Sequence, residues 1–256
     1  MKKHVHKLHV VDNQKITDTY FLLKLTHEQA LPPMLPAQFA EIKVEDAPHT
    51  FLRRPISIHD VNTDKNELHL LIEIKGEGTQ KLSELKPGNQ LDTIYPLGNT
   101  WTVPADASHV LLIGGGCGVA PLLYTARQFS SQGLKVSTLI GGRSKDNLLR
   151  KEAYKAFGEV YTCTEDGSYG EKALVTEHSV ISRLSDFDAV YTCGPEAMMK
   201  AVAALTQKND VFCQVSLENN MACGIGACLV CVQKTIHGNK RVCVDGPVFN
   251  VNELIW

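Results

Sequence analysis

Four cysteines near the C-terminus have the types and the spacing needed to bind a metal cluster. Cys223, Cys228 and Cys231 stand as C-x4-C-x2-C in the segment MACGIGACLVC, and Cys243 follows after eleven further residues. This spacing is the plant-type ligand pattern of a [2Fe–2S] cluster, which thiolates hold around one small inorganic core. The pattern therefore predicts one-electron transfer.

The residues between these cysteines suit the same chemistry. Gly224, Gly226 and Ala227 are small, so backbone N–H groups can approach the cluster sulfurs, and glycine permits positive φ. The segment LVCVQKTI predicts a strand, the residues at 237–240 predict a tight turn, and RVCV predicts the returning strand. We expect this hairpin to carry Cys243 back to the other three thiols.

Two other uses of four cysteines are open at this point. A zinc site with four cysteine ligands usually has two C-x2-C pairs, and this run holds one such pair. Structural disulfides need an oxidising compartment, which nothing else in the sequence indicates. The spacing favours the [2Fe–2S] cluster over both.

Two glycine-containing turns predict a nucleotide site. The segment GGGCGVAP at 114–121 follows an apolar strand and precedes a helix, where a pyrophosphate can meet backbone N–H groups and the positive helix end. It departs from the spaced G-x-G-x-x-G fingerprint, so a tight turn without a ligand is the alternative. The segment CGPE at 193–196 closes a later strand, and both turns should lie at the same carboxyl edge of the sheet.

A third candidate is the segment LRRPISI at 52–58. Arginine suits bidentate contact with phosphate, whereas the simpler interpretation is a solvated surface arginine.

The chain divides into three zones that must position these residues. Residues 1–100 contain short β-rich runs separated by Pro, Gly, Asn and Asp, with one helical segment at 79–85, and predict an antiparallel β-barrel. Residues 101–212 alternate apolar strands with helices and predict a parallel sheet of an α/β domain. Residues 213–256 predict a small module of loop and hairpin around the cysteines, ordered largely by the cluster.

Composition excludes several classes of protein. Hydrophobic residues make up 43%, charged residues make up 21%, and the formal net charge is -2, which gives no electrostatic basis for binding nucleic acid or an anionic membrane. The first residues lack the apolar run of a signal peptide, and the apolar run at 110–124 is broken by glycines and a proline. We expect a soluble cytoplasmic protein.

Taken over essentially the whole chain, these motifs resemble the ferredoxin–NADP reductase superfamily. The C-terminal segment SLENNMACGIGACLVCVQ, continued by RVCVDGPVF, resembles more specifically the electron-transfer subunit of type B dihydroorotate dehydrogenase. That resemblance implies FAD, a [2Fe–2S] cluster and NAD in this subunit. It also implies a partner subunit that holds FMN and oxidises dihydroorotate, in a heterotetramer with two copies of each subunit.

The resemblance also assigns site residues by position. Cluster ligands are Cys223, Cys228, Cys231 and Cys243. Residues that match the FAD motifs are Arg54, Pro55, Ile56, Ser57, Leu71, Ile72, Glu73, Gly78 and Thr79. Residues that match the nicotinamide segments are Gly114, Gly115, Gly116, Gly118, Pro121, Cys193, Gly194 and Pro195. No catalytic acid or base is expected.

The combination of cofactors explains the function we expect. Nicotinamide exchanges two electrons as hydride, a [2Fe–2S] cluster exchanges one, and flavin can do both. We expect electrons to pass from dihydroorotate through the FMN of the partner, then through the cluster and FAD of this chain, to NAD+, in pyrimidine biosynthesis. The alternatives are a reductase subunit for a sulfite reductase, hydrogenase or glutamate-synthase-like enzyme, or a redox sensor. Arg143 and Ser144 leave NADP open as the nucleotide.

Overall fold

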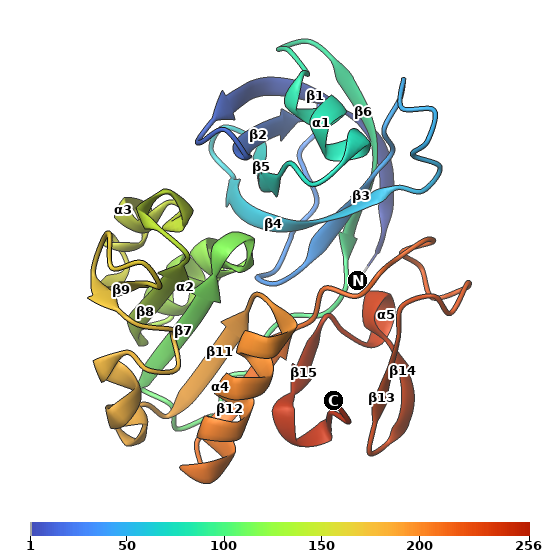
Figure 1. Ribbon diagram of the computed structural model, residues 1–256. Helices are drawn as coiled ribbons and strands as arrows, with labels where there is room; N and C mark the ends of the chain where they lie inside the picture. Colours follow the sequence, from blue (N-terminus) through green and yellow to red (C-terminus); the bar gives the residue numbers. More distant parts are fainter. Residues whose placement is uncertain (1) are drawn as a thin grey trace.

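The computed structural model describes residues 2–256 as three units packed against one another (Figure 1). In Figure 1 the barrel lies at the top, the α/β domain at the lower left and the C-terminal module at the lower right. No helix within residues 2–256 is long and apolar enough to cross a membrane.

The N-terminal unit is a closed antiparallel barrel with the strand order β1-β2-β5-β4-β3-β6. Its strands are β1 (His4–Lys15), β2 (Tyr20–Thr26), β3 (Phe39–Ile42), β4 (Arg54–Asn62), β5 (Glu67–Glu73) and β6 (Gln90–Leu97). Because side chains alternate along each strand, one face of apolar residues fills the interior, where Leu8, Leu23 and Leu70 are fully buried. The predicted barrel is confirmed. Its helix α1 (Glu77–Ser83) begins two residues before the expected start.

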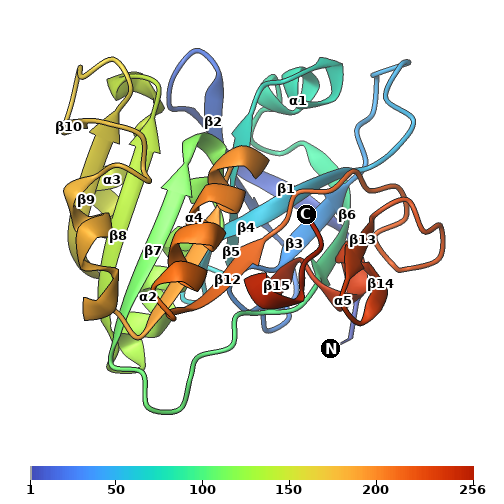
Figure 2. The ribbon, with the colours of Figure 1, turned by 60° about the horizontal axis from the view of Figure 1, so that its bottom comes forward.

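The second unit is a parallel sheet covered by helices on both faces. Its parallel strands are β7 (His109–Gly115), β8 (Lys135–Gly142), β9 (Gly158–Thr164), β10 (Glu171–Lys172), β11 (Ala189–Cys193) and β12 (Phe212–Ser216). Its helices are α2 (Leu122–Ser131), α3 (Lys151–Tyr154) and α4 (Glu196–Lys208). Leu112 packs with α2, whereas the next residue, Ile113, packs with α4, so these helices cover opposite faces of the sheet. Figure 2 shows α4 crossing one of these faces.

The C-terminal module contains a hairpin, as predicted, and one strand that the sequence did not predict. The predicted bounds of the hairpin were wrong, because the returning strand occupies 238–241, where the turn was expected, and Cys243 lies on a helix and not on that strand. The hairpin consists of β13 (Val232–Thr235) and β14 (Gly238–Arg241), and the short helix α5 (Val242–Asp245) follows. The last strand, β15 (Val248–Asn250), pairs antiparallel with β12, so the module adds an edge strand to the nucleotide-domain sheet. The sheet itself continues to the end of β12, four residues beyond the expected limit of 212.

One apolar cluster joins the three units. It contains Phe39 and Leu97 of the barrel, Val215 of the sheet, and Cys231 and Phe249 of the module. Figures 1 and 2 both show the module beside β3 and β6 of the barrel. The cysteine module is therefore packed against both the barrel and the α/β domain, and these contacts fix its position.

Buried and half-buried polar contacts fix the barrel against the α/β domain. The fully buried His59 on β4 donates from Nδ1 to the backbone oxygen of Ala120 at 2.8 Å. Arg127 on α2 pairs with Asp60 on β4 at 2.7 Å, and the Tyr124 hydroxyl donates to the barrel at 2.9 Å. Burial lowers the pKa of His59 to about 3, so the imidazole is neutral in the folded protein.

The buried His59 predicts a loss of stability in mild acid. An unfolded histidine takes up a proton near pH 6.5 and the folded one near pH 3, so protons favour the unfolded state as the pH falls through this window. Between about pH 7 and about pH 5, His59 should lower the free energy of unfolding by about 2 kcal/mol. Urea unfolding of the cofactor-free protein at both pH values measures the loss.

The variant His59→Gln should lose about 2 kcal/mol less than the wild type over this range. The control His237→Gln removes an exposed imidazole from the β13–β14 turn and should behave as the wild type. Equal losses in the wild type and in His59→Gln would contradict the prediction.

Candidate redox site

The four predicted cluster ligands come together as two pairs of thiols. The Cys223 thiol interacts with Cys228, and the Cys243 thiol interacts with Cys231. Cys231 and Cys243 are buried, whereas Cys228 is exposed, and every cysteine of the described chain carries a free thiol. Within residues 2–256, no three His, Cys, Asp or Glu side chains gather as a site for a single metal ion. Two pairs of thiols fit a binuclear cluster, in which each iron takes two protein ligands.

The loop between the first two ligands presents its backbone to sulfur. Gly224 and Gly226 have φ values of 63° and 84°, which side chains disfavour. The Ala227 N–H donates to Cys223 Sγ at 3.3 Å. Because N–H groups directed at sulfur tune a cluster, both the ligands and their surroundings fit a [2Fe–2S] group.

A buried carboxyl lies against this loop. Glu41 on β3 is fully buried, and neither of its carboxyl oxygens has a hydrogen-bond partner among the described residues. Burial raises the pKa of this carboxyl to about 7, and the nearby Arg53 and Arg54 oppose the rise. The sequence did not identify this residue, because the contact joins β3 to a loop more than 180 residues later.

The two glycine-containing turns lie in contact at one edge of the sheet. β7 and β11 are adjacent parallel strands, with Gly114 opposite Cys193. A Cβ atom on Gly118 would lie 2.3 Å from the backbone oxygen of Cys193 and 2.4 Å from the Cα atom of Gly194. Glycine is required there because the two turns touch backbone to backbone.

A cleft of about 750 Å³ opens above these turns, between the barrel and the sheet. Of the residues expected at the nicotinamide nucleotide, those that line the cleft are Gly115, Gly116, Gly118, Gly194 and Pro195. The others, Gly114, Pro121 and Cys193, are buried behind the lining. Met198 on α4 also lines the cleft.

The first FAD motif lies along β4, and it approaches α1. Pro55, Ile56 and Ser57 are half-buried in this strand. The side chain of Arg54 reaches the start of α1, where its Cδ would lie 3.3 Å from a Cβ atom on Gly78. The structure thus brings Arg54 and Gly78 together, as a shared anion would require.

In the third FAD motif, the hydroxyl of Thr79 makes hydrogen bonds within the turn before α1. The Thr79 hydroxyl accepts the Lys75 N–H at 2.9 Å and donates to the Gly76 oxygen at 3.1 Å. Thr79 therefore orders the turn that precedes α1.

The second FAD motif lies on β5 with its side chains on alternate faces. Leu71 packs with the core of the α/β domain, whereas Ile72 points into the barrel, so only the backbone of Ile72 can face a cofactor. Glu73 lines the cleft and pairs with Lys75 at 3.0 Å.

Glu218 is a site residue that the sequence analysis missed. It lies in the cleft two residues after β12, and its Oε1 is 3.8 Å from the thiol of the buried Cys193. Burial raises the pKa of the Glu218 carboxyl, and the positive charge of Lys75 opposes this rise. Its place beyond the carboxyl end of a parallel strand could have identified it, because ligands bind at that edge.

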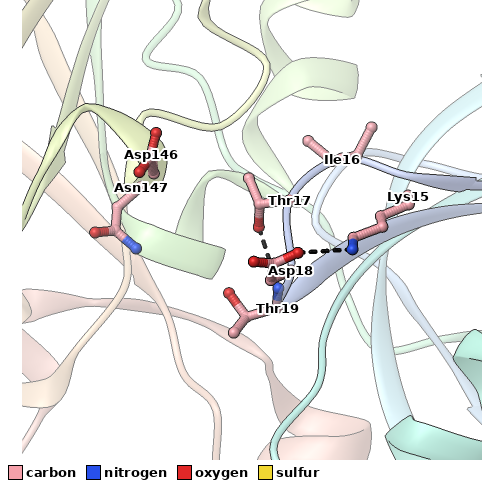
Figure 3. Close-up of a pocket in the computed structure, with 7 residues that line it drawn as sticks. All are labelled: Lys15, Ile16, Thr17, Asp18, Thr19, Asp146 and Asn147. Atoms are coloured by element: carbon pink, nitrogen blue, oxygen red, sulfur yellow. Dashed lines mark hydrogen bonds and ion pairs between the residues drawn. The ribbon is translucent and has the colours of Figure 1, made fainter.

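Tyr20 was also missed, and no sequence pattern could have identified it. Its hydroxyl interacts with Glu73 and, across the cleft, with Asn147 of the α/β domain, and burial raises its pKa. Near this contact a hollow of about 640 Å³ lies between the β1–β2 turn and residues 145–147. Figure 3 shows Asn147 and Asp146 on one side of this hollow and the β1–β2 turn on the other. Thr19 and Asn147 line both the hollow and the cleft, so the hollow extends the mouth of the cleft.

The contact of the turns predicts the effect of Gly118→Ala. The added methyl would push the first turn away from Cys193 and Gly194, so the affinity for NADH should fall about tenfold or more. Isothermal titration with NADH measures this affinity. The control Gly133→Ala changes a glycine with φ 87° and no atom within 4 Å, so it adds backbone strain without a collision. Undiminished affinity in Gly118→Ala would contradict the prediction.

Comparison with known proteins agrees with this site. The family described as "Iron-sulfur cluster binding domain of dihydroorotate dehydrogenase B" matches residues 218–255. The family described as "Oxidoreductase NAD-binding domain" matches residues 112–204.

Similar solved structures share the whole fold. The NADH-dependent reduced ferredoxin-NADP oxidoreductase, described for flavin-based electron bifurcation, superposes with a TM-score of 0.87 at 28% identity, over 97% of this chain and 90% of that chain. Phthalate dioxygenase reductase superposes with a TM-score of 0.65 at 16% identity, over 94% of each chain, which shows the fold alone.

Two curated relatives match over nearly their full length. The dihydroorotate dehydrogenase B (NAD(+)) electron transfer subunit of Shouchella clausii is 35% identical over 100% of both chains. The subunit of the same name from Caldanaerobacter subterraneus is 39% identical over 98% of both chains. The chain therefore belongs to the family of dihydroorotate dehydrogenase B (NAD(+)) electron transfer subunits.

Proposed function

We propose that this chain passes electrons from an FMN-containing subunit that oxidises dihydroorotate to NAD+, through a [2Fe–2S] cluster and FAD held by the chain itself. The observation that carries the proposal is the short connection between the two sites. Glu218 lines the nucleotide cleft, and Cys223, the first cluster ligand, follows only five residues later. Family membership supports the identity of the partner.

The three cofactors would be held by residues of different units of the chain. When bound, the cluster exchanges single electrons, the nicotinamide exchanges hydride, and the flavin can do both. Arg54 and Gly78 would hold the FAD pyrophosphate where the guanidinium meets the start of α1. Gly115, Gly116 and Gly118 would let the NAD phosphates approach the backbone.

The residues of the cleft position and enclose these groups without acting as acids or bases. Tyr20 and Asn147 interact across the cleft from opposite units. The Glu73–Lys75 ion pair, which has no net charge, lies at its edge. Arg143 also lines the cleft, so a 2′-phosphate could be accommodated there.

The partner should dock over the cysteine loop. Cys228 is exposed, and next to it Leu229 and Val230 are 61% and 53% exposed, which is uncommon for apolar side chains unless a surface binds another molecule. We infer a heterotetramer with two copies of each subunit, working in the cytoplasm. The ligand set comprises Cys223, Cys228, Cys231 and Cys243, and the boundaries between the three units lie near residue 100 and, after the end of β12, near residue 216.

A second candidate keeps the same electron route with a different redox partner. The similarity to the ferredoxin-NADP oxidoreductase structure, with its TM-score of 0.87, favours this candidate over a redox sensor.

The proposal predicts that Cys228→Ala separates two reactions. Loss of a ligand should lower dihydroorotate-dependent NAD+ reduction by the assembled complex by about 100-fold or more. Reduction of the flavin by NADH should persist, because the nucleotide cleft does not include Cys228. Stopped-flow absorbance measures the second reaction.

A matched control is Cys213→Ala, since Cys213 is buried in β12 and is not a proposed ligand. Coupled turnover that is unchanged in Cys228→Ala would rule out the route through the cluster.

A further inference from the structure

Glu41 lies on the barrel face that the C-terminal module covers. Along β3 the side chains alternate, so Ala40 and Ile42 belong to the barrel core. Phe39, on the opposite face, belongs to the apolar cluster that contains Cys231. Glu41 follows Phe39 on this outer face and is 0% exposed. Its carboxyl is therefore directed toward the cysteine module.

The carboxyl touches the loop that begins at the first cluster ligand. A Cβ atom on Gly224 would lie 2.7 Å from Cγ of Glu41 and 3.3 Å from its Oε1. Gly224 directly follows Cys223. No side chain separates the carboxyl from the backbone of the cluster loop at this point.

The protein provides little compensation for this carboxyl. Both oxygens are without a hydrogen-bond partner among the described residues, an arrangement that is costly in a buried site. The guanidinium of Arg53 is engaged elsewhere, at 2.9 Å from Oδ1 of Asp92 and 2.8 Å from the backbone oxygen of the same residue. Buried ionisable groups with strongly perturbed surroundings are enriched at functional sites.

We propose that Glu41, through the charge of its carboxylate, lowers the reduction potential of the bound [2Fe–2S] cluster. When ionised, this carboxylate opposes the addition of an electron nearby, and burial leaves the repulsion poorly screened. Charge, burial and hydrogen bonding around the sulfurs are the means by which proteins set such potentials. A lower potential makes the reduced cluster a stronger donor toward the nucleotide cleft, as NAD+ reduction requires. This inference rests on the proposed function, because it needs the cluster in place.

The test is a redox titration followed by electron paramagnetic resonance. The anaerobically purified wild type, Glu41→Gln and the control Glu45→Gln are compared at one alkaline pH, with iron and sulfide contents measured for each. In Glu41→Gln, which keeps the shape and removes the charge, the ratio of reduced to oxidised cluster at the wild-type midpoint should rise about tenfold, a shift of about 59 mV. Glu45 is an exposed carboxylate just beyond β3, so its removal should change the ratio by less than about twofold.

Three results would contradict either the inference about Glu41 or the proposed function. An unchanged midpoint in Glu41→Gln overturns the inference. If Glu41→Gln binds little iron, Glu41→Met provides a second uncharged side chain of similar size, and its midpoint should shift in the same direction. Loss of iron from both variants overturns the inference, because it would show that the carboxyl holds the loop and does not set the potential. A wild type without the cluster signal would refute the proposed function instead.

Discussion

The pairing of β15 with β12 is the contact on which the arrangement of the molecule depends. It extends the sheet of the α/β domain by a strand that belongs to the cysteine module. The same strand contributes Phe249 to an apolar cluster shared with Phe39 of the barrel. Since a module of about 40 residues cannot build an independent core, it is stabilised by burying its apolar face against both larger units. The distances between the cofactor sites are therefore fixed by the packing of the fold.

This packing also explains why a carboxyl group is buried at one junction. Glu41 lies between the barrel and the cluster loop, where it is fully buried, whereas Glu218 lines the cleft close to the first ligand. Glu41 would not be buried if the units were separate domains joined by a linker. Electron transfer requires that cofactors approach one another closely, so the surfaces that hold them must meet. Carboxyl groups at such junctions act on the cofactors through charge, in surroundings that screen charge weakly.

Local patterns allowed much of this structure to be predicted from sequence. The cysteine run, the presence of a hairpin after it and the strands of the barrel each depend on neighbouring residues. The position of both glycine-containing turns at one edge of the sheet followed from the expected parallel strands, whereas their direct contact did not. The parts that were missed depend on contacts between distant segments. Glu41 and Tyr20 gained their positions only when another unit packed against them, and β15 is too short for its alternation to be recognised.

The central claim is that this chain connects dihydroorotate oxidation to NAD+ through its own cluster. The most direct measurement is to purify the tagged chain anaerobically from its native host and to assay dihydroorotate-dependent NAD+ reduction across the eluted fractions. The account predicts that this activity co-elutes with the chain and with a second protein that contains FMN. A brown, FAD-containing eluate that reacts with NADH but lacks this activity would contradict it, and would assign the electron route to a different partner.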